Sequence, residues 1–268
     1  MAIILPTERS QAEVYLPNFM ILYGKPKTGK SSICAALPDC LIIDLEDGYK
    51  ALSVRKILAF SYNDIMAIRK AIIDKGKEIN KKPYKYIVID NATRLEEYCR
   101  PAAAAYYRTY KDPTWGILRD NKGKPIQNEG KYVPDPNADI TELGYGRGFE
   151  LIRSMVKNVI DSMKKVCDCL ILVSHTKESS ITTETSEMTE ISPDLTGKLS
   201  KILCGMADAI GYVYRENNET YVSFKGGGIT INQARPLHLR EQVFTVIKST
   251  EDDPTPVVDI KGIFGEQE

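Results

Sequence analysis

The chain of 268 residues carries 36 basic and 36 acidic side chains, so its formal net charge is zero. That length is enough to bury one full core, and the balanced charge excludes an overall field that would draw the protein to nucleic acid or to a membrane surface. The N-terminus lacks a basic region followed by a long apolar stretch, so we expect no signal peptide. No apolar run reaches the ~18 residues that a membrane span needs, so we expect a cytoplasmic protein that does not interact with membranes.

A phosphate-binding loop lies near the start of the chain. Residues 19–23 are apolar and predict a buried strand, and residues 31–37 predict a helix. Residues 24–31 match the pattern G-x-x-x-x-G-K-[ST] in the strand–loop–helix context that it requires. We expect main-chain N–H groups to face phosphate, Lys30 to reach the β- and γ-phosphates and Ser31 to hold Mg²⁺. The predicted nucleotide-binding residues are Gly24, Lys25, Pro26, Lys27, Thr28, Gly29, Lys30, Ser31 and Ser32.

The next elements alternate between strand and helix. Residues 40–45 and 86–90 are apolar runs that predict buried strands. Residues 62–79 place apolar side chains at helical spacing. A helix is expected again through residues 95–107, where Pro101 predicts a kink or a restart.

Residues 110–145 lose this pattern and predict a long loop, because Gly, Pro, Asn, Asp and Lys are frequent there. Beyond it we expect a helix over 148–165, a strand over 170–174, a Ser/Thr/Glu-rich loop over 177–193, a short helix near 199–206 and a hairpin of strands 209–215 and 220–225. The alternation predicts an α/β fold with a mostly parallel central sheet flanked by helices and a C-terminal antiparallel hairpin.

Two acidic residues are candidates to complete a nucleotide site. Asp90 ends its strand at the edge where ligands bind in parallel sheets, so we expect it to hold Mg²⁺ through water; the alternative is that it only caps the next helix. The residue after it is Asn91, so the carboxylate that activates water must come from elsewhere.

Glu46 follows the strand 40–45, which we expect beside the strand that precedes the phosphate loop. The alternative is that Glu46 belongs only to an acidic turn closed by Gly48.

Two further residue types bear on the site. His175 follows the strand 170–174, where a side chain can bond to the γ-phosphate and report its presence to the next loop; a purely structural histidine is the alternative. The six cysteines form no CxxC pair and no metal-like spacing with histidine. We expect them to be buried free thiols, which suits a reducing cytoplasm.

Several short motifs follow the phosphate loop in a characteristic order. They are Asp-x-Glu at 44–46, the lone Asp90, Gly-Tyr-Gly-x-Gly at 144–148, Ser-His-x-Lys at 174–177 and Ala-Asp at 207–208. Together they resemble the RecA-like branch of P-loop ATPases, and within it phage-encoded proteins of single-strand annealing or recombination. The resemblance implies a RecA-like fold, ATP and Mg²⁺ as cofactors, and the cytoplasm of a host cell. It also implies Glu46 as the catalytic glutamate, Asp90 as the Walker B acid and His175 as the γ-phosphate sensor.

The resemblance further implies a homo-oligomer. In RecA-like rings and filaments ATP lies between protomers, and a basic side chain of the neighbour contacts the γ-phosphate. Lys225 resembles that trans-acting base, with Arg215 and Arg235 as competitors and a solvated lysine as the alternative. Residues 1–17 are the candidate oligomerisation arm, residues 18–248 the ATPase domain with a loop insertion at 110–147, and residues 249–268 a C-terminal tail.

The insertion is the better candidate for a nucleic-acid contact. Residues 106–131 hold six basic and three acidic side chains together with three tyrosines and a tryptophan, and basic residues interleaved with aromatic ones suit a single-strand site. The candidates are Lys111, Trp115, Arg119, Lys122 and Lys124. The alternative is a solvated insertion anchored by its tryptophan. The acidic stretch 178–193, which has no Lys or Arg, is poorly suited to bind phosphates.

Two hypotheses about function follow. The first is a Mg²⁺-dependent ATPase that acts on single-stranded DNA in phage recombination, annealing or replication, with weak hydrolysis unless protomers or DNA are present. The second is an ATP-dependent switch for a replication or packaging partner without direct contact to DNA, which the acidic loop favours. A small-molecule phosphotransferase is disfavoured, because no compact Arg cluster is present for a lid.

Overall fold

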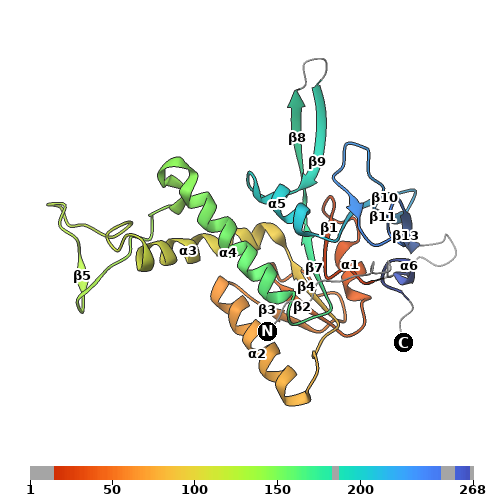
Figure 1. Ribbon diagram of the computed structural model, residues 1–268, viewed down its shortest axis with the longest axis horizontal. Helices are drawn as coiled ribbons and strands as arrows, with labels where there is room; N and C mark the ends of the chain where they lie inside the picture. Colours follow the sequence, from red (N-terminus) through yellow and green to blue (C-terminus); the bar gives the residue numbers. More distant parts are fainter. Residues whose placement is uncertain (1–14, 183–186, 249–256, 266–268) are drawn as a thin grey trace, which may run out of the picture.

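The computed structural model describes residues 15–182, 187–248 and 257–265 (Figure 1). Within them one sheet of ten strands forms the centre of the molecule. Six of its strands are parallel, and in spatial order they are β3 (Lys56–Leu58), β2 (Cys40–Asp44), β4 (Tyr86–Asp90), β7 (Cys169–Ser174), β1 (Phe19–Tyr23) and β10 (Ala209–Glu216). No described helix is both long and apolar enough to cross a membrane.

The sheet continues past β10 with antiparallel strands. These are β11 (Glu219–Ser223), β13 (Val243–Lys248) and β14 (Val257–Val258), while β12 (Gln233–Ala234) pairs with the start of β10. The predicted hairpin is therefore confirmed as β10–β11. Residues 257–265, which we expected in a tail, extend the sheet through β14, and Ile263 and Phe264 are buried on it. Residues 1–14 of the expected oligomerisation arm lie outside the described residues.

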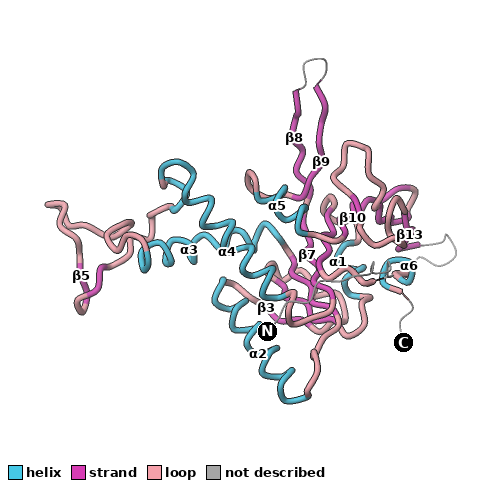
Figure 2. Tube along the Cα trace, in the orientation of Figure 1, coloured by secondary structure: helices cyan, strands magenta, loops and turns pink. Residues whose placement is uncertain are grey.

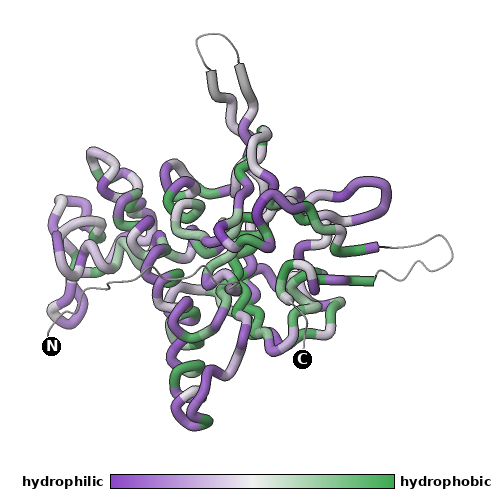
Figure 3. Tube along the Cα trace, turned by 45° about the vertical axis from the view of Figure 1, so that its right-hand side comes forward, coloured by the Kyte–Doolittle hydropathy of each residue, from purple (hydrophilic) through white to green (hydrophobic). Residues whose placement is uncertain are grey.

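Helices cover both faces of the sheet. One face carries α2 (Tyr62–Ile79), α3 (Ala92–Tyr110), α4 (Arg147–Met163) and α5 (Leu199–Met206), and the other carries α1 (Lys30–Ala35) and α6 (Lys261–Phe264). Strand β1 is buried on both sides, since Phe19, Ile21 and Tyr23 face the first core and Met20 and Leu22 the second. Figure 3 shows hydrophobic residues gathered along the central strands. The predicted α/β fold class is confirmed.

The predicted neighbour of β1 is wrong. Strand β2, which carries the turn with Glu46, does not pair with β1, because β7 and β4 lie between them. The register aligns Phe19 with Leu170, Leu170 with Ile87, and Ile87 with Leu41. The carboxyl ends of all four parallel strands still meet at one edge of the sheet. Glu46 therefore lies at the same edge as the phosphate loop, with two strands between them.

Two segments project from the body (Figures 1 and 2). The predicted loop 177–193 forms instead a two-stranded ribbon, β8 (Thr176–Thr182) and β9 (Glu187–Pro193). The segment between α3 and α4 contains β5 (Gln127–Asn128), β6 (Lys131–Tyr132), η1 (Ile140–Glu142) and η2 (Gly144–Gly146). Helix α3 leads to this segment and continues through Pro101 without a restart. At about 1.5 Å per residue, its 19 residues hold the insertion roughly 28 Å from the sheet edge.

Candidate nucleotide site

The phosphate loop connects β1 to α1, and its two glycines are required by contacts on either side. A side chain at Gly24 would overlap the Val213 carbonyl oxygen of β10. Gly29 has a φ of +100°, a conformation that glycine adopts without strain. The Thr220 hydroxyl of β11 donates to the Thr28 carbonyl at 3.2 Å. The antiparallel extension of the sheet therefore supports the loop from the side opposite to Asp90.

The Lys30 side chain lies inside the loop, and the residue is 6% exposed. It donates to the Gly24 and Lys25 carbonyl oxygens at 2.8 and 2.7 Å. Burial lowers the pKa of Lys30, and the nearby Asp90 charge opposes that shift. A phosphate oxygen can replace either carbonyl as the acceptor for the Lys30 ammonium. The new hydrogen bond would be stronger, because the phosphate is negatively charged and the ammonium is poorly solvated.

A cleft of about 290 Å³ opens at the carboxyl edge of the parallel strands. It brings together the predicted Lys30, Ser31, Glu46, Asp90 and His175. Gly24, Lys25 and Thr28 belong to the loop but do not line the cleft. The lining residues are Pro26, Lys27, Gly29, Lys30, Ser31, Ser32, Asp44, Glu46, Gly48, Tyr49, Asp90 and His175.

Asp90 is held by a tyrosine that the sequence analysis did not select. The Tyr49 hydroxyl donates to Asp90 Oδ2 at 2.7 Å. The alternative role of Asp90 as a helix cap is wrong, because the Asn91 side chain accepts from the Arg94 N–H and caps α3. Burial raises the pKa of Asp90, while the Tyr49 hydrogen bond and Lys30 act in the opposite direction.

Replacing Asp90 by Asn is expected to stabilise the ligand-free protein near pH 7, by a few degrees in Tm at most. The folded state binds the Asp90 proton more tightly than the unfolded chain, so ionisation above the ordinary pKa of 3.8 lowers the wild-type free energy of unfolding. Asn does not titrate, so the advantage of Asp90→Asn should grow with rising pH. Thermal unfolding between pH 4 and 8 measures this; an advantage that shrinks as pH rises would contradict it.

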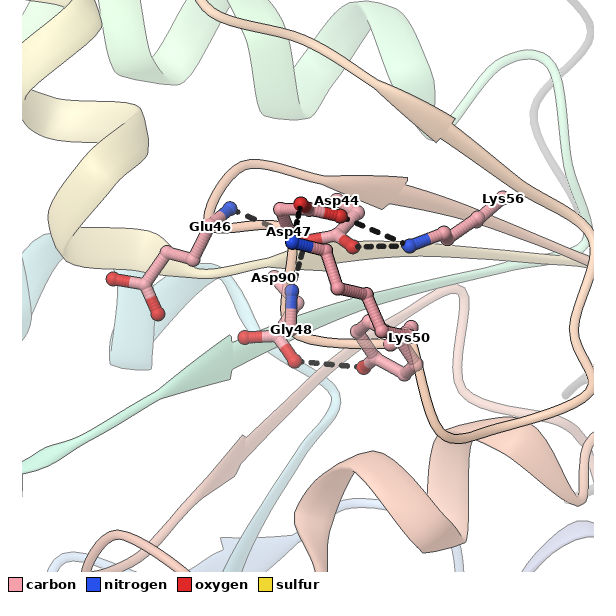
Figure 4. Close-up of polar contacts among 8 residues, drawn as sticks. Asp44, Glu46, Asp47, Gly48, Lys50, Lys56 and Asp90 are labelled. Atoms are coloured by element: carbon pink, nitrogen blue, oxygen red, sulfur yellow. Dashed lines mark hydrogen bonds and ion pairs between the residues drawn. The ribbon is translucent and has the colours of Figure 1, made fainter.

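Glu46 extends from a turn that other acidic residues hold in place. Asp44 Oδ1 accepts hydrogen bonds from the Glu46 and Gly48 N–H groups at 3.2 and 3.1 Å. Lys56 lies 3.4 Å from Asp44 and 3.2 Å from Asp47. Figure 4 shows these contacts and the Glu46 carboxylate pointing away from Lys56. The acidic turn that we considered as an alternative therefore exists, but it leaves the Glu46 side chain in the cleft.

The Glu46 carboxylate meets a basic residue of α3. Arg94 Nε lies 3.5 Å from Glu46 Oε1, and Arg94 Nη1 lies 2.6 Å from Glu97 Oε2. All three side chains are partly exposed, so this network contributes little to stability. It does orient Glu46 beside the start of α3, the helix that leads to the insertion.

His175 lines the cleft with one ring nitrogen unused. Nδ1 is buried and has no hydrogen-bond partner among the described residues. Its main-chain carbonyl accepts from the Asp194 N–H at 2.9 Å, which fixes the backbone at the start of β8. A buried ring nitrogen without a partner costs free energy. The position of His175 at the cleft is that expected for a γ-phosphate sensor, and this role stays a prediction.

The three candidate trans-acting bases lie in different places. Antiparallel β11 runs away from the phosphate loop, so Lys225, beyond its end, is exposed and does not line the cleft. Arg235 donates to Asp208 Oδ1 at 3.2 Å and to the Gly205 carbonyl. Arg215 is exposed and pairs with Thr220, which bonds to the loop. Arg215 is therefore the candidate nearest to the phosphate loop.

The donor set fits Mg²⁺ bound together with a nucleotide. Among the described residues no group of three or more His, Cys, Asp or Glu side chains could hold a metal by itself. Mg²⁺ is commonly bound through one or two carboxylates plus substrate phosphates, and the cleft supplies the Ser31 hydroxyl and the Asp90 carboxylate. The six cysteines are free, and five of them are buried.

The candidate nucleic-acid residues lie in the projecting insertion, away from the cleft. Lys111, Arg119, Lys122 and Lys124 are exposed. Trp115 is half-buried; its ring meets Tyr107 edge-on at 5.5 Å between centroids, and the Arg108 guanidinium lies 5.8 Å from its centroid. Trp115 thus anchors the insertion to α3, as the alternative expected, while the lysines remain open to solvent.

The comparisons with known proteins come from sequence and from structure. Residues 16–242 match the family described as AAA domain. No curated protein matches the chain. Among solved structures, the chain is similar to one described as the RadB recombinase, with 13% sequence identity and a TM-score of 0.46 over 91% of this chain and 92% of that one.

Proposed function

The chain belongs to the AAA domain family, and we propose that it is a Mg²⁺-dependent ATPase of the RecA-like type that acts on single-stranded DNA. The observation that carries the ATPase proposal is the cleft, where one sheet edge unites Lys30, Ser31, Asp90, Glu46 and His175. Lys30 would bind the β- and γ-phosphates, Ser31 and Asp90 would hold the metal, which neutralises charge on the phosphates, and Glu46 would orient water.

Glu46 and His175 divide the remaining tasks of hydrolysis. Glu46 lines the cleft, where its carboxylate contacts Arg94 at 3.5 Å, and this partly exposed pairing leaves oxygen lone pairs that can accept a proton from water. His175 can donate to a γ-phosphate oxygen through a ring N–H, and it directly precedes β8. Loss of the γ-phosphate would therefore remove a contact of His175 and could change the conformation at the base of the β8–β9 ribbon.

The nucleic-acid part of the proposal rests on the insertion. Its exposed lysines follow the end of α3, so the length of that 19-residue helix separates them from the cleft. Basic side chains on a projecting segment suit a sequence-independent contact with a phosphate backbone. A second copy of the chain would supply the trans-acting base, for which Arg215 and Lys225 both remain candidates, and hydrolysis by an isolated protomer would be slow.

Single-stranded DNA is expected to raise ATP turnover, and the double variant Lys122→Ala/Lys124→Ala should lose most of that stimulation. Steady-state hydrolysis with and without DNA, at two salt concentrations, measures it, since phosphate contacts weaken as salt rises. The matched control is Lys75→Ala/Lys77→Ala on α2, which removes the same charge from another exposed surface and should retain the stimulation.

Turnover that ignores DNA would favour the second function, an ATP-dependent switch for a protein partner. The β8–β9 ribbon supports that alternative, because residues 176–193 include four glutamates and one basic residue, Lys177, and it begins at the residue after His175. An acidic ribbon repels a nucleic-acid backbone and suits a basic protein surface. Equal stimulation of both double variants would show that DNA acts elsewhere than at the insertion.

A further inference from the structure

Tyr49 lines the cleft and is almost fully buried, with 1% of its surface exposed. It directly follows the turn that carries Glu46, and its hydroxyl crosses to the neighbouring strand to donate to Asp90 Oδ2 at 2.7 Å. A short hydrogen bond to a carboxylate, shielded from water, is among the stronger kinds in a protein. The buried ring holds the Tyr49 hydroxyl in place against the Asp90 carboxylate.

The other Asp90 oxygen has a different environment. Within the described residues Oδ1 accepts no hydrogen bond, and Asp90 lines the cleft together with Ser31. A hydrogen bond to one oxygen of a carboxylate restricts its rotation about the terminal bond. Asp90 therefore lines the cleft with Oδ2 held by Tyr49, and the Ser31 side chain lines the same cleft.

Tyr49 also ends a turn whose backbone is held at several points. Asp44 accepts from two N–H groups of the turn, and Lys56 ties Asp44 to Asp47. The Leu45 N–H donates to the Asp90 carbonyl at 2.8 Å. The backbone that carries Glu46 and the strand end that carries Asp90 are therefore joined twice, once through the main chain at Leu45 and once through the Tyr49 side chain.

We propose that Tyr49 is a positioning residue for the metal of the nucleotide complex, holding Asp90 oriented toward Mg²⁺ and the Glu46 turn in register with it. The inference rests on the proposed function, since it concerns Mg²⁺ bound with ATP at this cleft. Groups that hydrogen-bond to a metal-binding carboxylate restrict its orientation, and their removal commonly costs 10- to 100-fold in metal affinity.

The test is the change Tyr49→Phe, read by equilibrium binding of a fluorescent ATP analogue with Mg²⁺ and with EDTA. We expect metal-free affinity to stay within about twofold of wild type, because the phosphate loop is intact. The factor by which Mg²⁺ tightens binding should fall about tenfold. In turnover assays the half-saturating Mg²⁺ concentration should rise, while KM for ATP at saturating Mg²⁺ changes little.

Tyr86 provides a matched control. It is also a fully buried tyrosine of this sheet, and its hydroxyl has no hydrogen-bond partner among the described residues. Tyr86→Phe removes the same atom from the interior without touching the cleft, so both affinities should stay at the wild-type values. Thermal unfolding of both variants shows whether either change has altered the fold.

A double-mutant cycle locates the effect at Asp90. If Tyr49 acts through Asp90, then Tyr49→Phe in an Asp90→Asn background should cause little further loss of the Mg²⁺ effect. An undiminished Mg²⁺ effect in Tyr49→Phe, or an equal loss with and without metal, overturns the inference and leaves the ATPase proposal intact. Failure of the wild-type protein to bind the analogue, or to respond to Mg²⁺, overturns both.

Discussion

Changing Lys30 to Ala is expected to weaken ATP binding about 100-fold and to abolish turnover. In the ligand-free protein the ammonium donates to two loop carbonyls and is nearly excluded from water. In the complex it would donate instead to phosphate oxygens, and hydrogen bonds between charged partners contribute about 1.5–3 kcal/mol each. Two such bonds exceed the roughly 2.7 kcal/mol that correspond to a 100-fold change in affinity.

Lys25→Ala is the matched control for this change. Lys25 belongs to the same loop and carries the same charge, but its side chain is 64% exposed and lies 3.9 Å from Glu178. It does not line the cleft, so its loss should alter affinity by about twofold at most. Calorimetric titration with ATP measures both variants, and thermal unfolding confirms that each is folded. Wild-type affinity in Lys30→Ala would remove the phosphate loop from the function.

The features that the sequence predicted best depend only on residues that are adjacent in the chain. The phosphate loop needs two glycines, a lysine and a serine at fixed spacing, and the structure places them between a buried strand and a helix. Helix α2 over Tyr62–Ile79 and strand β4 over Tyr86–Asp90 have the predicted bounds. Their periodicity is a local property, so no knowledge of distant contacts is needed to find them.

The order of strands could not be read in the same way. Four parallel strands, β1, β2, β4 and β7, are buried on both faces. Their sequences are similar apolar runs, so they do not indicate which strands pair with each other. The position of β7 between β1 and β4 follows from crossover connections through helices, which sequence patterns do not specify. The error about the neighbour of β1 arises from this ambiguity.

The β8–β9 ribbon and Tyr49 were missed for two further reasons. The ribbon projects from the body and is buried at its base, at Ile191 and Ser192, a stretch too short to show an alternation of apolar and polar residues. Its Ser, Thr and Glu residues therefore resemble a loop. Tyr49 follows an acidic turn, and nothing in the sequence distinguishes a tyrosine that holds a carboxylate from one that only fills the core. Arg94 contacts Glu46 from a different element, a pairing that exists only after folding.

The second large effect is expected for Glu46→Gln, which should lower ATP turnover by 100-fold or more while leaving ATP affinity within about threefold of wild type. A positioned general base commonly contributes 10²- to 10⁴-fold to the rate. Gln keeps the size of the side chain but accepts a proton poorly. The turn should be unchanged, because Asp44 and Lys56 hold it through other atoms.

Glu97→Gln separates the catalytic carboxylate from the general charge around Arg94. Glu97 contacts the same guanidinium as Glu46, at 2.6 Å, but it does not line the cleft. Each change removes one negative charge beside Arg94, so only the position of the carboxylate differs between the two variants. Turnover of Glu97→Gln should remain within a few-fold of wild type.

Single-turnover hydrolysis with excess protein measures the chemical step directly, and the ATP analogue titration measures binding in the same preparations. Loss of turnover with binding retained assigns Glu46 to the step in which water attacks, since an interaction made only in the transition state lowers the rate and not the affinity. A parallel loss in Glu46→Gln and Glu97→Gln would mean that the charge balance around Arg94, and not a base in the cleft, controls hydrolysis. Wild-type turnover in Glu46→Gln would mean that another group, such as His175 at the same cleft, orients the water.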